Sequence, residues 1–143
     1  LYLAADGEID TTPLQLLARN LCKELYLPRI TNDNSLTFCH WREQVPLVPN
    51  RYNIPEPPAD AAQCQPSDLD IIFLPMVGWD RSGRRLGMGG GYYDRTLANV
   101  TGPVLVGLAH ANQEVTALPL ESWDVVVDYV ATDIGLCGTG PRG

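Results

Sequence analysis

A nearly uninterrupted apolar run at residues 69–77 is followed at once by a polar, glycine-rich stretch at residues 78–91. A short apolar run with polar flanks is typical of a strand that other layers cover on both faces. We therefore expect it at the centre of a sheet. A short helix is expected at residues 92–100, and further strands at 104–109 and 125–131. Strands that alternate with helices predict an α/β fold, with a mostly parallel sheet and helices packed on its faces.

The N-terminal half predicts fewer regular elements. Residues 1–4 resemble the end of a buried strand, and leucines at helical spacing predict a helix at residues 12–24. Two short strands are expected at residues 25–30 and 36–41, joined as a hairpin by a polar turn. Residues 45–66 hold six prolines, which predicts a long extended connection.

The length of 143 residues fits one domain, which we place at residues 1–134. The glycine-rich residues 135–143 are expected to be a flexible tail. With 45% hydrophobic and 19% charged residues the chain is not disordered. A net charge of −7 argues against a protein that coats nucleic acid. The chain starts at Leu1 rather than at a methionine, so we expect the natural chain to extend upstream.

Membrane and redox functions are not indicated either. The longest apolar runs are far shorter than the roughly 20 residues of a membrane span, and no signal peptide is visible, so a cytoplasmic protein is expected. The four cysteines have no C-x-x-C spacing and are expected to be reduced and structural. The oligomeric state cannot be derived from these patterns.

Basic residues gather around the glycine-rich stretch of this acidic protein. Four of the ten, Arg81, Arg84, Arg85 and Arg95, lie within residues 81–95. Consecutive glycines allow backbone N–H groups to converge on a phosphate, and a helix start follows directly. The sequence therefore predicts a Gly-rich phosphate loop between the central strand and a helix. The P-loop and dinucleotide-binding patterns both fail here, so a solvated surface loop remains the alternative.

The stretch DRSGRRLGMGGGYYDR at residues 80–95 resembles the signature of the 5-formyltetrahydrofolate cyclo-ligase family. Further similarity lies in DGEID at residues 6–10, YNIPEP at 52–57 and LPLESWD at 118–124, in the family's order. The resemblance implies an ATP- and Mg²⁺-dependent closure of 5-formyltetrahydrofolate to 5,10-methenyltetrahydrofolate, with ADP and phosphate as the other products. Members of the family begin with a basic helical segment that contacts ATP, and this sequence begins after it.

The resemblance also implies roles for individual residues. Those expected to bind ATP are Arg85, Leu86, Gly87, Met88, Gly89, Gly90, Gly91, Tyr92 and Tyr93. Those expected to bind the folate are Leu3, Glu8, Tyr52, Met88, Gly89, Gly90, Gly91 and Tyr92. Asp94 is expected to hold Mg²⁺, with a second ligand among Glu121, Asp124 and Asp128. No residue outside the phosphate loop is assigned a catalytic role.

Two other functions remain open at this stage. The first is a truncated, non-catalytic module of the same fold that binds a nucleotide or a folate. The second is a sugar-phosphate isomerase of similar architecture, although the loop offers no histidine or glutamate as the general base that such an enzyme needs. His40 and His110 have no neighbouring metal-ligand spacing and are expected to be structural.

Overall fold

The computed structural model describes residues 1–4, 8–86, 91–119 and 125–139. Two α-helices are formed within them, α1 (Thr12–Asn20) and α2 (Tyr92–Leu97). The strands are β1 (Tyr26–Ile30), β2 (Leu36–His40), β3 (Val48–Pro49), β4 (Pro55–Glu56), β5 (Gln63–Cys64), β6 (Ile71–Pro75), β7 (Gly78–Trp79), β8 (Arg85–Leu86), β9 (Val104–Leu108), β10 (Tyr129–Thr132) and β11 (Gly135–Gly138). Two 3₁₀ helices lie at Pro66–Asp68 and Ala111–Gln113. Neither described α-helix is long and apolar enough to cross a membrane.

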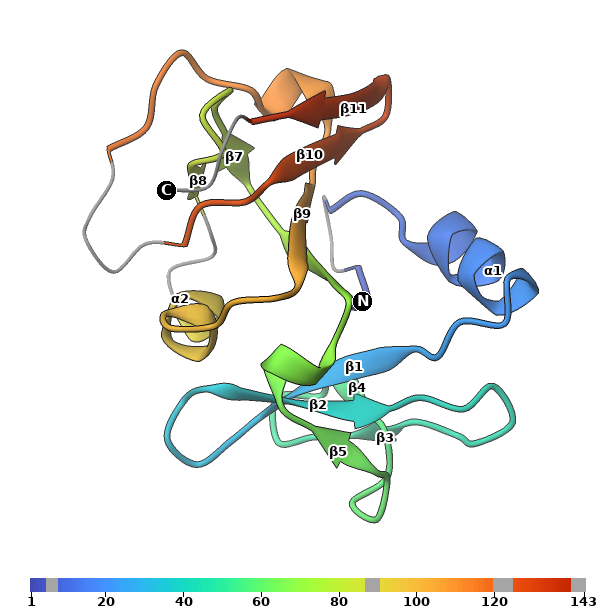
Figure 1. The fold of residues 1–143 in the computed structure, drawn as a ribbon. Helices are drawn as coiled ribbons and strands as arrows, with labels where there is room; N and C mark the ends of the chain where they lie inside the picture. The colour runs from blue at the N-terminus through green and yellow to red at the C-terminus, as the bar shows by residue number, and fades with distance from the viewer. Residues whose placement is uncertain (5–7, 87–90, 120–124, 140–143) are drawn as a thin grey trace.

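The larger sheet has the strand order β11-β10-β9-β6 (Figure 1). β6 pairs with β9 and β9 with β10 in parallel, whereas β11 joins β10 in antiparallel register. A second sheet, β1-β2-β5, is antiparallel, as are the small ribbons β3-β4 and β7-β8. The expectation of a mostly parallel sheet fits the larger sheet, in which two of the three pairings are parallel, but is not confirmed for the fold as a whole, because the other described sheets are antiparallel. The short connection between β1 and β2 permits only a hairpin, and a hairpin is antiparallel.

The apolar run of residues 69–77 forms β6, but β6 lies at the edge of the larger sheet as described, not at its centre. Its side chains alternate between two apolar clusters: Ile72 and Leu74 face one, and Phe73 packs against the other. Both faces of the strand are thus covered, which explains the continuous apolar run. Ile71 is 49% exposed, since β6 has no described neighbour on its outer edge.

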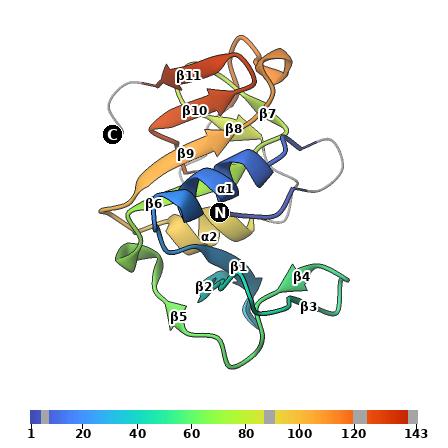
Figure 2. The same ribbon diagram turned by 90° about the vertical axis from the view of Figure 1, so that its right-hand side faces the viewer.

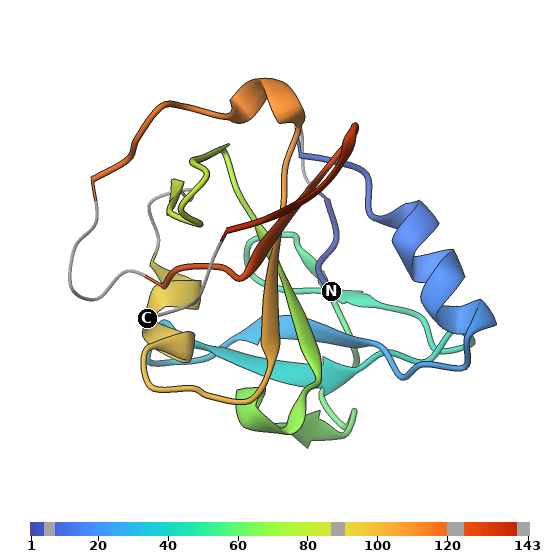
Figure 3. The same cartoon turned by 45° about the horizontal axis from the view of Figure 1, so that its top comes forward.

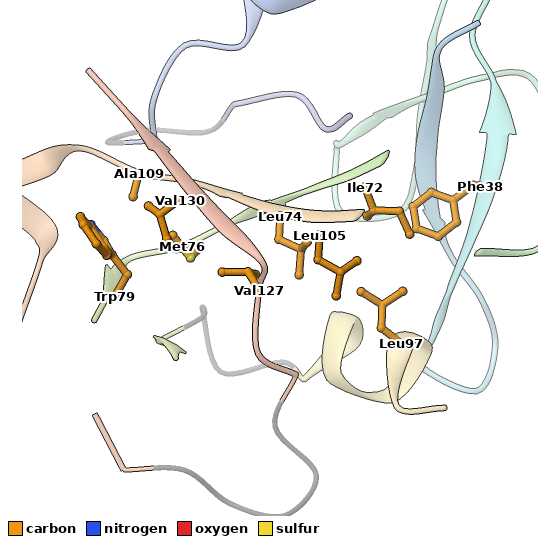
Figure 4. Packing of buried hydrophobic residues seen from close by; sticks show 10 residues of the cluster. All are labelled: Phe38, Ile72, Leu74, Met76, Trp79, Leu97, Leu105, Ala109, Val127 and Val130. Carbon is orange, nitrogen blue, oxygen red and sulfur yellow. The ribbon is translucent and has the colours of Figure 1, made fainter. Parts of the chain in front are cut away.

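The first cluster fills the space between the parallel strands, α2 and the β1-β2 hairpin (Figure 4). Its buried members are Phe38, Ile72, Leu74, Met76, Trp79, Leu97, Leu105, Ala109, Val127 and Val130. Figure 3 shows the β1-β2 hairpin at the end where β6 and β9 begin. Gly107 makes room for the Met76 side chain, because a Cβ there would lie 2.5 Å from it.

The second cluster lies on the opposite face of the sheet, under the N-terminal segment and α1 (Figure 2). Tyr2, Val106 and Leu108 are buried there, and Leu14 packs against them. The two helices therefore cover opposite faces, which Figure 1 shows as α1 and α2 on either side of β9. The predicted placement of helices on both faces of the sheet is confirmed.

The helix predicted at residues 12–24 is shorter in the structure. It ends at Asn20, because Cys22 adopts a left-handed conformation with φ of 56°. The amides of Cys22 and Lys23 then bond to the carbonyls of Arg19 and Ala18, which closes the C-terminus in a Schellman motif. No residue of α1 is buried, and Leu17 is 54% exposed, so the expected apolar face is only partly covered.

Three further expectations differ from the structure. Residues 1–4 form no regular strand, although Tyr2 is buried. The residues assigned to a flexible tail include β11, Gly135–Gly138, which is held by cross-strand pairing with β10. Such pairing depends on backbone groups rather than on side chains, so a glycine-rich composition does not prevent it. The strand expected at residues 125–131 begins only at Tyr129.

Candidate ligand-binding site at the carboxyl end of strand β6

The arginine-rich residues 81–95 begin in a tight turn between β7 and β8. Hydrogen bonds to the carboxylate of Asp80 hold the backbone of this turn. Asp80 is 2% exposed, and its Oδ1 accepts hydrogen bonds from the amides of Ser82 and Arg84 at 2.9 and 3.1 Å. Its Oδ2 accepts a hydrogen bond from the amide of Leu118 at 2.9 Å. Gly83 has a φ of 86°, and a Cβ there would lie 2.4 Å from the carbonyl oxygen of Val127. The amide of Gly83 donates to the carbonyl of Asp80 at 3.1 Å, which closes the turn.

Three of the four arginines in this segment bind other parts of the protein. Arg81 forms two hydrogen bonds with the Glu114 carboxylate, at 2.8 and 3.1 Å, on the surface. Arg84 donates to the carbonyl of Leu118 at 3.0 Å. Arg95 donates from Nε to the carbonyl of Asn34 at 2.9 Å. Their concentration in the sequence therefore reflects at least partly structural roles.

Arg85 differs from these three, because its side chain is only 7% exposed. Its Nη1 lies 3.4 Å from Oδ1 of Asp94, and its Nη2 donates to the carbonyl of Pro75, the last residue of β6, at 3.4 Å. Its guanidinium carbon lies 5.8 Å from the centre of the Tyr93 ring. The buried Nε of Arg85 has no hydrogen-bond partner among the described residues. A buried donor without a partner is costly, and because Nε has almost no exposed surface, an anionic ligand reaches it only if its neighbours move.

Asp94 lies in the first turn of α2 and joins three elements. Its Oδ1 accepts hydrogen bonds from Arg85 and, at 3.0 Å, from the amide of Val125. Both bonds to described residues use Oδ1. Among the described residues, no group of three or more His, Cys, Asp or Glu side chains is arranged to hold a metal.

Of the three candidates for a second metal ligand, only Asp128 lies among the described residues. Glu121 and Asp124 lie outside the described residues. Asp128 is described, and its Oδ2 accepts a hydrogen bond from the amide of Leu105 at 2.8 Å. The side chain of Asp128 therefore helps to join β9 to the segment that enters β10.

Tyr93, beside Arg85, interacts electrostatically with two further residues, Tyr2 and Glu8. Burial raises the pKa of the Tyr93 phenol above its usual value, while the Arg85 cation opposes this rise and the Glu8 carboxylate adds to it. Burial likewise raises the pKa of Tyr2, with smaller contributions from Glu8 and Tyr93. The hydroxyl of Tyr2 is buried and finds no hydrogen-bond partner in the part of the chain that the structure describes. The structure thus brings the predicted residues Arg85, Tyr93 and Asp94 together, whereas the links from Tyr93 to Glu8 and Tyr2 are electrostatic.

The other predicted site residues divide into three groups. Leu3, Leu86, Gly91 and Tyr92 are described: Leu3 is half-buried beside Tyr2, and Gly91 has a φ of 69° directly before α2. The prediction for Gly87, Met88, Gly89 and Gly90 falls outside the described residues. Tyr52 lies elsewhere, in the turn between β3 and β4, where it is 53% exposed and borders a surface pocket of about 240 Å³.

The sequence assigned Tyr2 to the core as part of an apolar segment, and the structure confirms that Tyr2 is buried in the second cluster. The sequence could not show that the Tyr2 hydroxyl lacks a hydrogen-bond partner among the described residues, because this depends on how the structure packs around it. The expectation that His40 and His110 are structural agrees with their contacts. The rings of His40 and Tyr26 lie 5.1 Å apart, and the carbonyl of His110 accepts a hydrogen bond from the Trp79 indole.

A buried cation next to the carboxyl end of a parallel strand makes this edge of the α/β sheet the candidate site for an anionic ligand. The comparisons with known proteins identify the family. A model of the 5-formyltetrahydrofolate cyclo-ligase family matches residues 1–133. The chain is 43% identical over 138 residues to the 5-formyltetrahydrofolate cyclo-ligase of Escherichia coli K12, covering 92% of this chain and 75% of that protein. It is 42% identical over 132 residues to the Haemophilus influenzae enzyme of the same name, covering 87% and 70%.

The solved structures agree with these relatives. The chain superimposes on the 5,10-methenyltetrahydrofolate synthetase of Aquifex aeolicus with a TM-score of 0.82 and 33% identity, covering 99% of this chain and 72% of that one. The corresponding protein of Mycoplasma pneumoniae, at 22% identity and a TM-score of 0.70, shares the fold. This chain belongs to the 5-formyltetrahydrofolate cyclo-ligase family, and it is a cyclo-ligase.

Proposed function

We propose that this chain converts 5-formyltetrahydrofolate and ATP into 5,10-methenyltetrahydrofolate, ADP and phosphate, with Mg²⁺ as the metal. The observation that supports this most strongly is the buried Arg85, whose Nε has no partner among the described residues, in a chain that is 43% identical to a named cyclo-ligase. The formyl oxygen would attack the γ-phosphorus of ATP, and ADP would leave. N10 would then attack the activated formyl carbon, and the oxygen would leave as part of the phosphate.

The protein's contribution to such a reaction is to hold the reactants and to neutralise charge. Once its neighbours move, Arg85 would donate from Nε to a phosphate oxygen while Asp94 keeps its guanidinium in place. The backbone of the loop that precedes Gly91 would surround the phosphates. Because Arg85 is desolvated, its interaction with a phosphate would be stronger than that of an exposed arginine.

Asp94 is the residue proposed to hold Mg²⁺. Carboxylate oxygens are the ligands that this cation prefers, and Oδ2 of Asp94 takes part in neither of the described bonds of that side chain. Bound there, Mg²⁺ would neutralise charge on the phosphates. The pairing with Arg85 would keep the Asp94 carboxylate beside the guanidinium that is proposed to bind the phosphates.

The folate is proposed to contact Glu8, Leu3 and Tyr52. A carboxylate such as that of Glu8 suits the paired N–H donors of a 2-amino-4-oxo pterin ring. Half-buried Leu3 offers an apolar contact, and the Tyr52 ring offers a surface for stacking. Tyr52 lies on the hairpin β3-β4 rather than with Arg85, so the substrate would extend from one part of the protein to the other.

The experiment that tests this function follows methenyl absorbance after 5-formyltetrahydrofolate is added with ATP and Mg²⁺. We expect product only when both are present, and Arg85→Met should lower turnover by at least a hundredfold. Arg81→Met is the matched control, since it removes the same group from the same loop, but from a surface pair with Glu114. Product formation without ATP would refute the reaction. Binding of both ligands without turnover would instead identify a non-catalytic module.

A further inference from the structure

The turn that carries Tyr52 is unusually well bonded for a surface turn. The amide of Asn50 donates to the carbonyl of Ile54, and the amide of Asn53 donates to the carbonyl of Asn50, both at 2.9 Å. Asn53 occupies the left-handed region, with a φ of 61°, which asparagine tolerates better than most residues. The backbone on both sides of Tyr52 is therefore closed into a defined turn.

The side chain of Asn50 makes three further hydrogen bonds. Its Oδ1 accepts from the amides of Tyr52 at 2.8 Å and of Ile54 at 3.0 Å. Its Nδ2 donates to Oε2 of Glu56 at 3.0 Å. One amide group therefore fixes both the residue that bears the ring and the strand that follows it.

Glu56 connects this turn to the rest of the fold. Its Oε1 lies 3.8 Å from Nε of Arg29 on β1, and the two side chains are only 13% and 17% exposed. Arg29 also donates to the carbonyls of Pro57 and Pro58. The half-buried pair thus anchors the hairpin to β1, and Asn50 extends the anchor to Tyr52.

The ring of Tyr52 has little else to hold it. It is 53% exposed, and the guanidinium of Arg51 lies 4.8 Å from its centre. A mobile aromatic ring loses conformational freedom when it stacks on a ligand, and this loss weakens binding. A backbone fixed in advance reduces the loss.

We propose that Asn50 is a positioning residue of the substrate site: its amide holds Tyr52 at the edge of the adjacent pocket and thereby sets the affinity for the reduced folate. The inference rests on the stacking role given to Tyr52 in the proposed function. Asn50 is given no role in the phosphoryl chemistry, so its removal should change folate affinity and leave that chemistry unchanged.

The test uses Asn50→Ala, which removes all three side-chain bonds, and Asn50→Asp in a Glu56→Gln background, where it keeps the acceptor for the two amides without setting two carboxylates beside each other. Because each lost hydrogen bond weakens the ordering of the turn, Asn50→Ala should raise the KM for 5-formyltetrahydrofolate about tenfold. The KM for ATP and kcat should stay within about twofold, and Asn50→Asp in that background should recover part of the folate affinity. Asn20→Ala, on the exposed end of α1, is the control and should change none of these constants.

A double-mutant cycle with Tyr52→Ala identifies the route of the effect. If Asn50 acts through Tyr52, the replacement of Asn50 should cost almost nothing further once the ring is gone. A full additional loss in the double variant would overturn the inference, and so would an unchanged folate KM in Asn50→Ala. If Tyr52→Ala itself leaves the folate KM unchanged, the assignment of Tyr52 in the proposed function fails as well. Melting curves identify any variant that unfolds, and Asn50→Asp then carries the comparison.

Discussion

Asp94→Asn changes a single charge in the structure and has two separable consequences. The substitution keeps the size of the side chain and an acceptor for the amide of Val125. It removes the negative charge that lies 3.4 Å from the guanidinium of Arg85. At that distance, with an effective dielectric constant of about 20, the attraction of a full pair is about 5 kcal/mol.

The net cost should be smaller than this attraction. Removing one partner of a buried pair costs about 3–5 kcal/mol, because the other charge stays buried and uncompensated. Asp94 retains 21% exposure, which lets water moderate the loss and places the cost near the lower end, at about 3 kcal/mol. For a domain of this size that corresponds to a fall in Tm of roughly 10 °C.

The assay is a melting curve of each variant, combined with turnover at a temperature where all are folded. Arg85→Met/Asp94→Asn, which removes both charges, should recover part of the lost stability and remain inactive. Glu114→Gln breaks the exposed pair with Arg81 and should leave the Tm unchanged, since solvent screens that interaction. A Tm of Asp94→Asn within about 2 °C of the parent would refute the reasoning from Arg85. An unchanged Mg²⁺ dependence of turnover in that variant would remove Asp94 from the metal site.

Three further predictions concern stability. Tyr2→Phe should raise the Tm, because it removes a buried hydroxyl without a partner among the described residues, at a gain of about 1–3 kcal/mol; a lower Tm would show that the hydroxyl has a partner in solution. Gly83→Ala should cost about 3 kcal/mol or more, through strain at positive φ and a Cβ 2.4 Å from the Val127 carbonyl oxygen. At Gly102, where φ is 108°, an added Cβ would have no atom within 4 Å, so Gly102→Ala should cost about 1 kcal/mol. Equal costs for Gly83→Ala and Gly102→Ala would contradict the geometry. Finally, the free energy of unfolding should fall as the pH rises above about 10. Tyr93 ionises there in the unfolded state, whereas burial keeps its pKa higher in the folded state. The unfolded state then binds fewer protons than the folded state, so a rise in pH favours unfolding. Chemical denaturation between about pH 10 and 11 measures this slope, and Tyr93→Phe should reduce it; an identical slope in that variant would exclude Tyr93 as the cause.

The elements themselves were largely predictable from local patterns. The β1-β2 hairpin, β6, β9 and the start of α2 at Tyr92 all lie where apolar periodicity and turn residues place them. The ends of elements were less predictable. α1 stops at Asn20 because Cys22 takes a left-handed conformation, and no residue type that usually does so marks the position.

Part of the candidate site was predictable as well. The cluster of arginines and glycines predicted a phosphate loop, but the sequence could not show which arginine is desolvated. Arg81, Arg84 and Arg95 bind partners distant in the sequence, and only packing against β6 and α2 leaves Arg85 buried, with no described partner for its Nε. The loss of solvent around a side chain depends on all of its neighbours, so it does not follow from the residue's place in a motif.

The sequence by itself determined the family, the alternation of strands and helices, and the residue types of the site, because these depend on local patterns and on a long motif match. The tertiary structure decided which strands are neighbours, which face each helix covers and which charges meet. It placed β6 at a sheet edge, joined β11 to β10, and paired Arg85 with Asp94. These features arise from contacts between distant segments, and the free energy of such contacts depends on how completely the segments exclude water.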